Sequence, residues 1–422
     1  MKRKTRVSVL ATAFVTGVTV LAFAGSVVNS VPSAHVGKKA SAPVHLTLGM
    51  WSSSPAELQL VQNQVALFHK ANPNITVSIR VINGNYMQAL QPMLASHTAP
   101  DIFYVDSSVA PQLEAAGALM NLDSYIKQDK VDLKDFNANL LQAFTWKNSL
   151  YGLPKDFNTL ALEYNKTLFA KAGIKAAPTT WTQLQQDAAL LKKKGIASLS
   201  FPIDVARYYP LVLDFGGNYY NGARNQATFP NPANRRGLQY FMTMQQDGVM
   251  LQPSAQGGSW AGEPFAQGKV AMAAEGAWII PFMQQTAPKL NYGIAKFPGI
   301  NGKDYNMIYT VSYSMAKSTK YPEQAAKLLF FMTGPQAEKL TALSGLAIPS
   351  RTSEQNVFLS KNPSYKAFVD GVKQAAPYQF GTLGQNFVDA INNATEAGIL
   401  KHQSPQKVLS NAIATLTSQS QY

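Results

Sequence analysis

The chain has 422 residues, a formal net charge of +14 and no cysteine, and 46% of its residues are hydrophobic. This length indicates two domains with sizeable cores, and the lack of cysteine excludes disulfides and thiol chemistry. Lysines and arginines are scattered, and the run Lys192–Lys194 stands where a helix would end, so nucleic-acid binding is not indicated. Charged residues make up only 14% of the chain, against about 25% in typical domains, and acidic residues (23) are fewer than basic ones (37). Because neutral polar groups do not titrate, we hypothesise that the protein works in an acidic exterior.

The N-terminus has the features of a signal peptide. Lys2, Arg3, Lys4 and Arg6 precede an apolar run over 7–24, which ends in the small-x-small sequence Ala22-Phe23-Ala24. We predict a signal peptide over 1–24 and a flexible tether over 25–43; retention of the apolar run as a membrane anchor is the alternative. Either way the body is expected outside the cytoplasm, in the periplasm or at the outer face of the cytoplasmic membrane, without a lipoprotein cysteine.

Strands and helices alternate after the tether. The alternating segments 44–51 and 75–82 and the segment 100–108 predict strands. Between them, Ser54 as N-cap, Pro55 and Glu57 predict a helix that Asn72-Pro73 ends, and a shorter helix begins at Tyr86. This order is typical of a parallel sheet with crossover helices.

The same alternation resumes after a polar interruption, Lys155 to Asn158, which follows Gly152 and Pro154. Predicted strands are 159–165, 269–278 and 307–316. Predicted helices include one with a Thr180/Gln183 capping box, one from Asn231-Pro232 to Gly248, two split at Gly334-Pro335, and most of 363–416. The pattern predicts a second α/β lobe, with the first crossing between lobes at the polar interruption.

Motifs for catalysis are weak. The five histidines are isolated and lack metal-ligand spacing. The segment "GEPFAQGKV" departs from a phosphate-binding loop, and no Gly-x-Ser-x-Gly sequence occurs. Paired carboxylates for glycoside hydrolysis would be spatial neighbours, so that alternative stays open. We expect no enzyme activity, no cofactor and no metal.

Aromatic and polar residues gather at the ends of predicted strands. Ligands of open α/β sheets bind at the carboxyl ends of strands, and an indole or phenol ring can stack on the apolar face of a pyranose. This criterion selects the following residues: Trp51, Asp106, Trp260 and Trp278, with Tyr208, Tyr209, and Tyr309 or Tyr313 as further candidates.

Five segments in order resemble one known family: "ASHTAPDIFYVD", "LYGLPKDFNTLALEYNKTLFAKAGI", "TTWTQLQQDAALL", "EPFAQGKVAMAAEGAW" and "AIPSR". They are similar to the family 1 extracellular solute-binding proteins, the maltose-binding-protein-like sugar receptors of ABC importers. The resemblance implies a two-lobed periplasmic-binding-protein-like fold (type II), in which each lobe is a mostly parallel sheet flanked by helices. It implies that sugar is held in the cleft between the lobes, and it adds Asp156, Asn158 and Arg351 to the expected ligand-binding residues.

The resemblance also implies an organisation and partners. Lobe I is expected over 44–154 and about 306–347, and lobe II over 155–305 and about 348–422. A sugar or oligosaccharide and the permease subunits of an ABC transporter are the expected partners of a monomeric protein. The alternatives are a receptor of the same fold for glycerol phosphate, ferric iron (through Tyr208-Tyr209 and Tyr219-Tyr220) or another small solute, and a secreted glycoside hydrolase.

Overall fold

The computed structural model describes residues 42–222, 225–300 and 302–419. The predicted signal peptide lies outside them, as does all of the predicted tether except Ala42 and Pro43. The chain from Ala42 onward forms one compact unit. Within these ranges, no helix has both the length and the apolar character needed to cross a bilayer.

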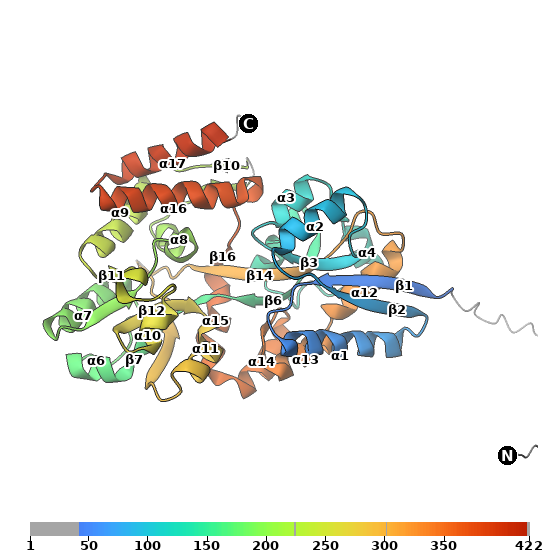
Figure 1. Cartoon of the computed structure of the whole chain (residues 1–422), viewed down its shortest axis with the longest axis horizontal. Coiled ribbons are helices and arrows are strands. Elements are labelled where there is room, and N and C mark those ends of the chain that lie inside the picture. Colours follow the sequence, from blue (N-terminus) through green and yellow to red (C-terminus); the bar gives the residue numbers. More distant parts are fainter. Residues whose placement is uncertain (1–41, 223–224, 301, 420–422) are drawn as a thin grey trace, which may run out of the picture. The chain divides into compact units, whose positions relative to one another are not determined.

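The first of two main sheets has the strand order β15-β6-β14-β3-β1-β2, with β16 also paired to β14 (Figure 1). Its strands are β1 (Val44–Met50), β2 (Ile75–Val81), β3 (Ile102–Asp106), β6 (Gly152–Asn158), β14 (Asn306–Met315), β15 (Ile348–Pro349) and β16 (Ala375–Pro377). The predicted alternation of strands and helices over 44–108 is confirmed, with parallel β1, β2 and β3.

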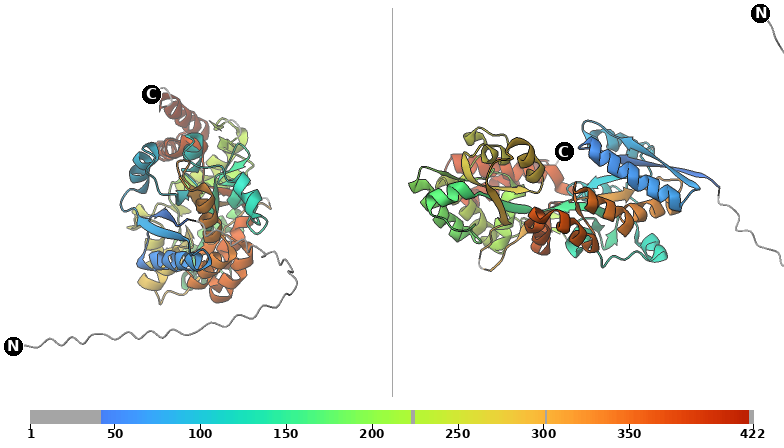
Figure 2. Two further views of the ribbon diagram at one scale, coloured as in Figure 1. Left: turned by 90° about the vertical axis from the view of Figure 1, so that its right-hand side faces the viewer. Right: turned by 90° about the horizontal axis from the view of Figure 1, so that it is seen from below.

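Helices cover both faces of this sheet (Figures 1 and 2). They are α1 (Pro55–Ala71), α2 (Tyr86–Ala95), α3 (Ala110–Ala115), α4 (Asp123–Asp129), α5 (Ala138–Gln142), α12 (Pro322–Met332), α13 (Pro335–Ser344) and α14 (Thr352–Lys361). Successive side chains of a strand point to opposite faces. Ile102 and Tyr104 therefore pack with residues of α1, α4 and α12, whereas Phe103 and Val105 pack with α2 and α3.

The second sheet has the order β11-β8-β12-β7-β13. Its strands are β7 (Leu160–Asn165), β8 (Ala197–Ser200), β11 (Met250–Leu251), β12 (Val270–Gly276) and β13 (Tyr292–Lys296), and two short hairpins join β4 (Thr145–Trp146) to β5 (Ser149–Leu150) and β9 (Tyr220–Asn221) to β10 (Gln226–Ala227). The helices that follow are α6 (Lys166–Ala172), α7 (Trp181–Lys193), α8 (Val205–Asp214), α9 (Pro232–Gln246), α10 (Gly262–Ala266), α11 (Ile279–Thr286), α15 (Lys366–Gly371), α16 (Gly384–Leu400) and α17 (Pro405–Gln419). Both sheets are therefore built from strands that alternate with helices, as the sequence predicts.

Local capping explains where several helices begin. The Ser54 hydroxyl accepts from the amide of Glu57 at 3.2 Å, and the Thr180 hydroxyl accepts from the amide of Gln183 at 3.1 Å. Each glutamate or glutamine reaches back to a backbone N–H before the helix. These contacts satisfy amides that have no partner inside the helix, so both predicted capping boxes are confirmed.

The chain passes from the first sheet to the second between Asn158 and Leu160. A buried Asn306 side chain accepts from the Leu160 amide at 2.9 Å and donates to the Leu160 carbonyl at 2.8 Å. The neighbouring Thr159 hydroxyl donates to the carbonyl of Phe368 at 2.6 Å. Hydrogen bonds from side chains thus connect this crossing segment to two parts of the chain that lie far away in sequence.

Two details differ from the sequence-based expectation. The sheets are mixed, because β14 runs antiparallel to β3 and β6, and β7 runs antiparallel to β12 and β13. The polar interruption Lys155 to Asn158 is part of strand β6, paired with β14 on one side and β15 on the other. The lobe boundaries themselves stay a prediction, since the described chain forms one compact unit.

Candidate functional site

A cavity of about 760 Å³ takes its lining from elements of both sheets. One wall comes from the end of β1, the first half of α1, and strands β3, β6 and β14. The opposite wall comes from Trp278 and Pro281, which follow β12. Four predicted ligand-binding residues line this cavity: Trp51, Asp156, Asn158 and Trp278.

Aromatic rings form much of the first wall. Trp51 lies edge-on to Tyr104 at a centroid distance of 5.0 Å, and Tyr104 lies edge-on to Tyr313 at 5.2 Å. Tyr104 and Tyr313 face each other because they are register partners on β3 and β14. Trp51 is only partly buried, so its ring is available to a ligand.

On the second wall, Trp278 is fixed by a carboxylate and a cation behind it. Its indole N–H donates to Glu275 Oε2 at 3.0 Å, and the same oxygen accepts from Arg207 Nη2 at 2.8 Å. The Arg207 guanidinium lies 5.4 Å from the centroid of the indole ring, within range of a cation–π contact. Gly276 makes this arrangement fit, because a Cβ there would collide with the indole ring. Since its N–H is already bonded, Trp278 has its ring face left to offer.

A buried pair of glutamates supports this arrangement. Glu163 Oε2 accepts from the amide of Glu275 at 3.2 Å, and both side chains are almost inaccessible to solvent. Burial, reinforced by the charge of Glu275, raises the pKa of Glu163 well above its ordinary value. Burial thus favours the neutral acid form of Glu163, whereas Glu275 forms the ion pair with Arg207.

Charged groups meet at the floor of the cavity. Lys155 forms ion pairs with Asp156 and with Glu57, the latter at 3.8 Å, and its Nζ lies 4.5 Å from the centroid of the Tyr104 ring. Burial alone would lower the pKa of Lys155, but the charges of Asp156 and Glu57 outweigh burial and raise it. Lys155 is thus a permanent cation between two carboxylates.

Two further polar groups complete the lining. Asn158 accepts from the amide of Ala277 at 2.8 Å, which ties β6 to the turn that carries Trp278. Glu338 accepts from the amide of Ser350 at 2.8 Å. Burial raises the pKa of Glu338 well above its ordinary value and so favours the neutral acid.

Two predicted residues lie beside the cavity without lining it. Asp106 pairs in register with the cavity residue Val311, and its carboxylate accepts from the amide of Ser108 at 2.9 Å and from the Ser108 hydroxyl. Tyr309 stands edge-on to Trp278 at 5.5 Å, and its hydroxyl accepts from Arg207 at 3.1 Å. Tyr309 therefore supports the indole from behind.

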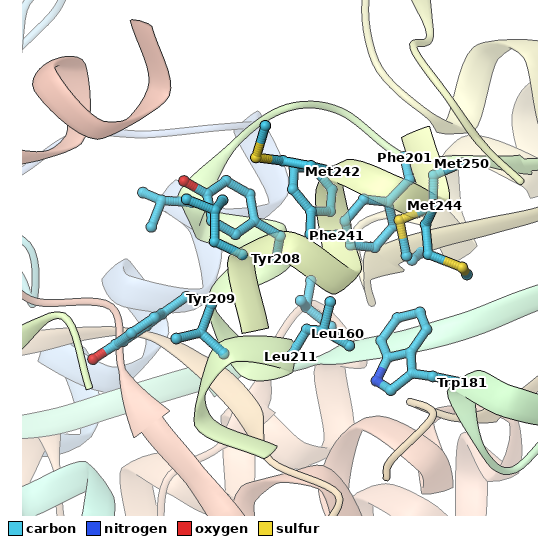
Figure 3. Packing of buried hydrophobic residues seen from close by; sticks show 14 of the residues in the cluster. Leu160, Trp181, Phe201, Tyr208, Tyr209, Leu211, Phe241, Met242, Met244 and Met250 are labelled. Atoms are coloured by element: carbon cyan, nitrogen blue, oxygen red, sulfur yellow. The ribbon is translucent and has the colours of Figure 1, made fainter. Parts of the chain in front are cut away.

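The structure places the other three predicted residues elsewhere. Tyr208 is fully buried and stacks on Phe241 at 4.4 Å inside the core of the second sheet's helices (Figure 3). Trp260 packs against Phe282 at 4.7 Å, outside the cavity. The buried Arg351 donates to the carbonyl of Thr333 at 2.5 Å and forms an ion pair with Asp135 at 3.2 Å. For these three, packing partners far away in sequence determine the position.

Sequence reasoning missed several lining residues as ligand contacts. Glu57 was assigned only to a helix cap, although its carboxylate also faces Lys155. Tyr104 precedes Asp106 by two residues, so strand alternation could have selected it. Tyr313, a further strand-end candidate beside Tyr309, does line the cavity.

The cavity can therefore hold a ring-shaped ligand between aromatic faces while polar groups contact its rim. The carboxylates and the Asn158 carbonyl are acceptors, and Lys155 is a donor. Burial of polar groups in such a place makes each unmatched hydrogen bond costly, which gives selectivity.

Comparison with known proteins agrees with this geometry. A family model described as bacterial extracellular solute-binding protein matches residues 51–339. The chain is 27% identical over 369 residues to a binding protein of Brucella abortus, covering 82% of this chain and 86% of that protein. It is 24% identical to the galactooligosaccharide-binding protein of Bacillus subtilis, covering 70% and 71% of the two chains.

Solved structures share the fold. The cyclic alpha-maltosyl-1,6-maltose binding protein from Arthrobacter globiformis matches with a TM-score of 0.79 and 20% identity, covering 89% of this chain and 98% of that one. A cyclo/maltodextrin-binding protein complexed with maltotetraose matches with a TM-score of 0.78 and 21% identity, covering 90% and 98%. The two-lobed architecture, the ligand-sized cavity and the family match agree: this chain belongs to the bacterial extracellular solute-binding proteins.

Proposed function

We propose that this protein is the extracytoplasmic substrate-binding component of an ABC importer, and that it captures a sugar or oligosaccharide. One observation carries the proposal: Trp51 from one side and Trp278 from the other line a single cavity of about 760 Å³ with charged and amide groups between them. An aromatic face can stack on the apolar C–H face of a pyranose, and polar groups can bond its hydroxyls. Relatives whose names include galactooligosaccharide and maltotriose support the same ligand class.

Capture is proposed to work by a shift between conformations. Because the cavity lining comes from both sheets, a ligand that contacts both walls at once favours the closed arrangement by its differential affinity. The permease subunits at the membrane would then recognise the closed, loaded form. The protein would act as a monomer outside the cytoplasm and would release its ligand unchanged.

Within this proposal, Trp51, Asp156, Asn158 and Trp278 contact the ligand. Asp106 and Tyr309 lie next to lining residues and do not contact the ligand directly. The ferric-iron alternative is not favoured, because Tyr208 and Tyr219 are fully buried in the core.

A thermal-shift screen tests the proposal. Purified protein is heated alone and with mono- to tetrasaccharides of glucose, galactose and mannose, and positive results are repeated by calorimetry. A ligand at 100 times its Kd adds about 2.7 kcal/mol of stability and should raise the melting temperature by about 3 °C or more. Unchanged melting across the whole saccharide set would refute the function, and newly formed reducing ends after incubation would refute the absence of catalysis.

A further inference from the structure

The charges in the cavity carry an inference about which saccharides the protein accepts. We propose that Glu57, Lys155 and Asp156 form a charge filter that rejects anionic saccharides, such as uronic acids and sugar phosphates, and accepts neutral and amino sugars. The inference rests on the proposed function, because it concerns the ligand class of the same cavity.

The first step is the state of Lys155. Among the described residues that line the cavity, Lys155 is the one cationic side chain. An anionic ligand would need it as a partner. Lys155 is already engaged by Asp156 and by Glu57, and its Nζ lies over the Tyr104 ring.

The second step is the balance of charge. One cation faces two carboxylates, so the three side chains leave one uncompensated negative charge at the cavity floor. The side chains of Lys155, Glu57 and Asp156 are only 13%, 14% and 18% exposed, so water screens this charge weakly. A second negative charge brought alongside is repelled, whereas a protonated amine is attracted.

The third step is the N-terminus of α1, which also borders the cavity and could otherwise attract an anion. Its free donors are largely used within the chain. Pro55 has no N–H, the Glu57 amide donates to Ser54, and the Glu57 carboxylate accepts from the amide and hydroxyl of Ser53 at 2.8 and 2.6 Å. Glu57 therefore occupies this end of the helix with its own negative charge.

The opposite wall adds no charged side chain to the cavity. Trp278 and Pro281 are its contribution, and the Arg207 cation behind the indole is already paired with Glu275. The positive net charge of the whole chain thus does not extend to the cavity lining.

The test uses ligands matched in shape and different in charge. For each neutral saccharide that binds, calorimetry measures four Kd values. They are those of the neutral parent, its 6-uronic acid, its 6-phosphate and its 2-amino-2-deoxy analogue. In low salt the anionic analogues should bind about tenfold more weakly or worse, and the amino analogue at least as tightly as the neutral parent. The difference in Kd between charged and neutral analogues should become smaller at about 0.5 M salt, because salt screens the charges.

Variants link the effect to the named residues. Glu57→Gln and Asp156→Asn each remove one charge with little change of shape, and each should reduce the discrimination by about threefold or more. Glu263→Gln is the matched control, because Glu263 also accepts from the amide and hydroxyl of a serine four residues earlier, at 2.5 and 3.1 Å, but lies outside the cavity. It should leave the discrimination unchanged.

The outcomes separate the two proposals. If an anionic analogue binds as tightly as its neutral parent, or if neither cavity variant changes the ratio, the charge filter is refuted while sugar binding stands. If no saccharide of any charge binds, the proposed function is refuted and the charge filter with it.

Discussion

Replacing Glu275 by glutamine removes the charge that faces Arg207 behind Trp278. The matched variant is Glu163→Gln, which makes the same chemical change in the glutamate that contacts the backbone of Glu275. The two positions have equal burial, at 0% and 1% exposed, so burial alone predicts equal costs. The ion pair of Glu275 with Arg207 predicts instead that Glu275→Gln destabilises the fold much more than Glu163→Gln does.

The magnitude follows from the contacts. Glu275 is the ion-pair partner of Arg207 at 2.8 Å, and the Arg207 side chain is 15% exposed. Removing one partner of a buried pair costs about 3 to 5 kcal/mol, and the partial exposure of Arg207 favours the lower end, about 3 kcal/mol. Burial raises the pKa of Glu163 and favours its neutral acid form, which glutamine resembles, so Glu163→Gln should cost about 1 kcal/mol or less.

Urea unfolding at pH 7, followed by circular dichroism, measures both costs from the shift of the transition midpoint at constant slope. Equal losses of stability in the two variants, or a larger loss for Glu163→Gln, would refute the assignment of charge within this pair. A loss below about 1 kcal/mol for Glu275→Gln would refute the view that Arg207 depends on Glu275.

Three further predictions use the same protein. Trp278→Ala should weaken saccharide binding more than about tenfold, about 1.4 kcal/mol, whereas Trp260→Ala, outside the cavity, should leave calorimetric affinity unchanged; equal effects would remove Trp278 from the site. Gly276→Ala should also weaken binding in a folded protein, because the added Cβ displaces the indole, and wild-type affinity would contradict that packing. Burial raises the pKa of Glu114 to about 8 and of Asp214 to about 7, so their stabilising contribution is complete below about pH 4 and is lost as the pH rises through 7 and 8. Urea midpoints should therefore fall from pH 5 to pH 8, less steeply in Glu114→Gln, and a rising midpoint would contradict the direction of both shifts.

Local signals were sufficient for much of the fold. Ser54 and Thr180 identified helix starts because a capping hydroxyl acts within four residues. Strand directions were not predictable in this way. The antiparallel course of β14 beside β3 depends on how the chain returns after about 200 residues, and alternation in sequence is the same for either direction.

The same distinction separates the candidate site residues. Trp51 follows β1 directly and Trp278 follows β12 after one residue, and the position of a strand end is a local property. The position of Tyr208 depends on its packing against Phe241. The position of Arg351 depends on its contact with Asp135, which lies 216 residues earlier in the chain. Nothing near Tyr208 or Arg351 in the sequence specifies those partners.

The paired hydrogen bonds between Asn306 and Leu160 join positions 146 residues apart in the chain. Loop closure over such a distance carries an entropic cost that must be met before the contact contributes, which slows folding. Because Asn306 begins β14, the segments that cross between the two sheets can be fixed to each other only after this late strand has been synthesised, so the two sheets should be joined late in folding.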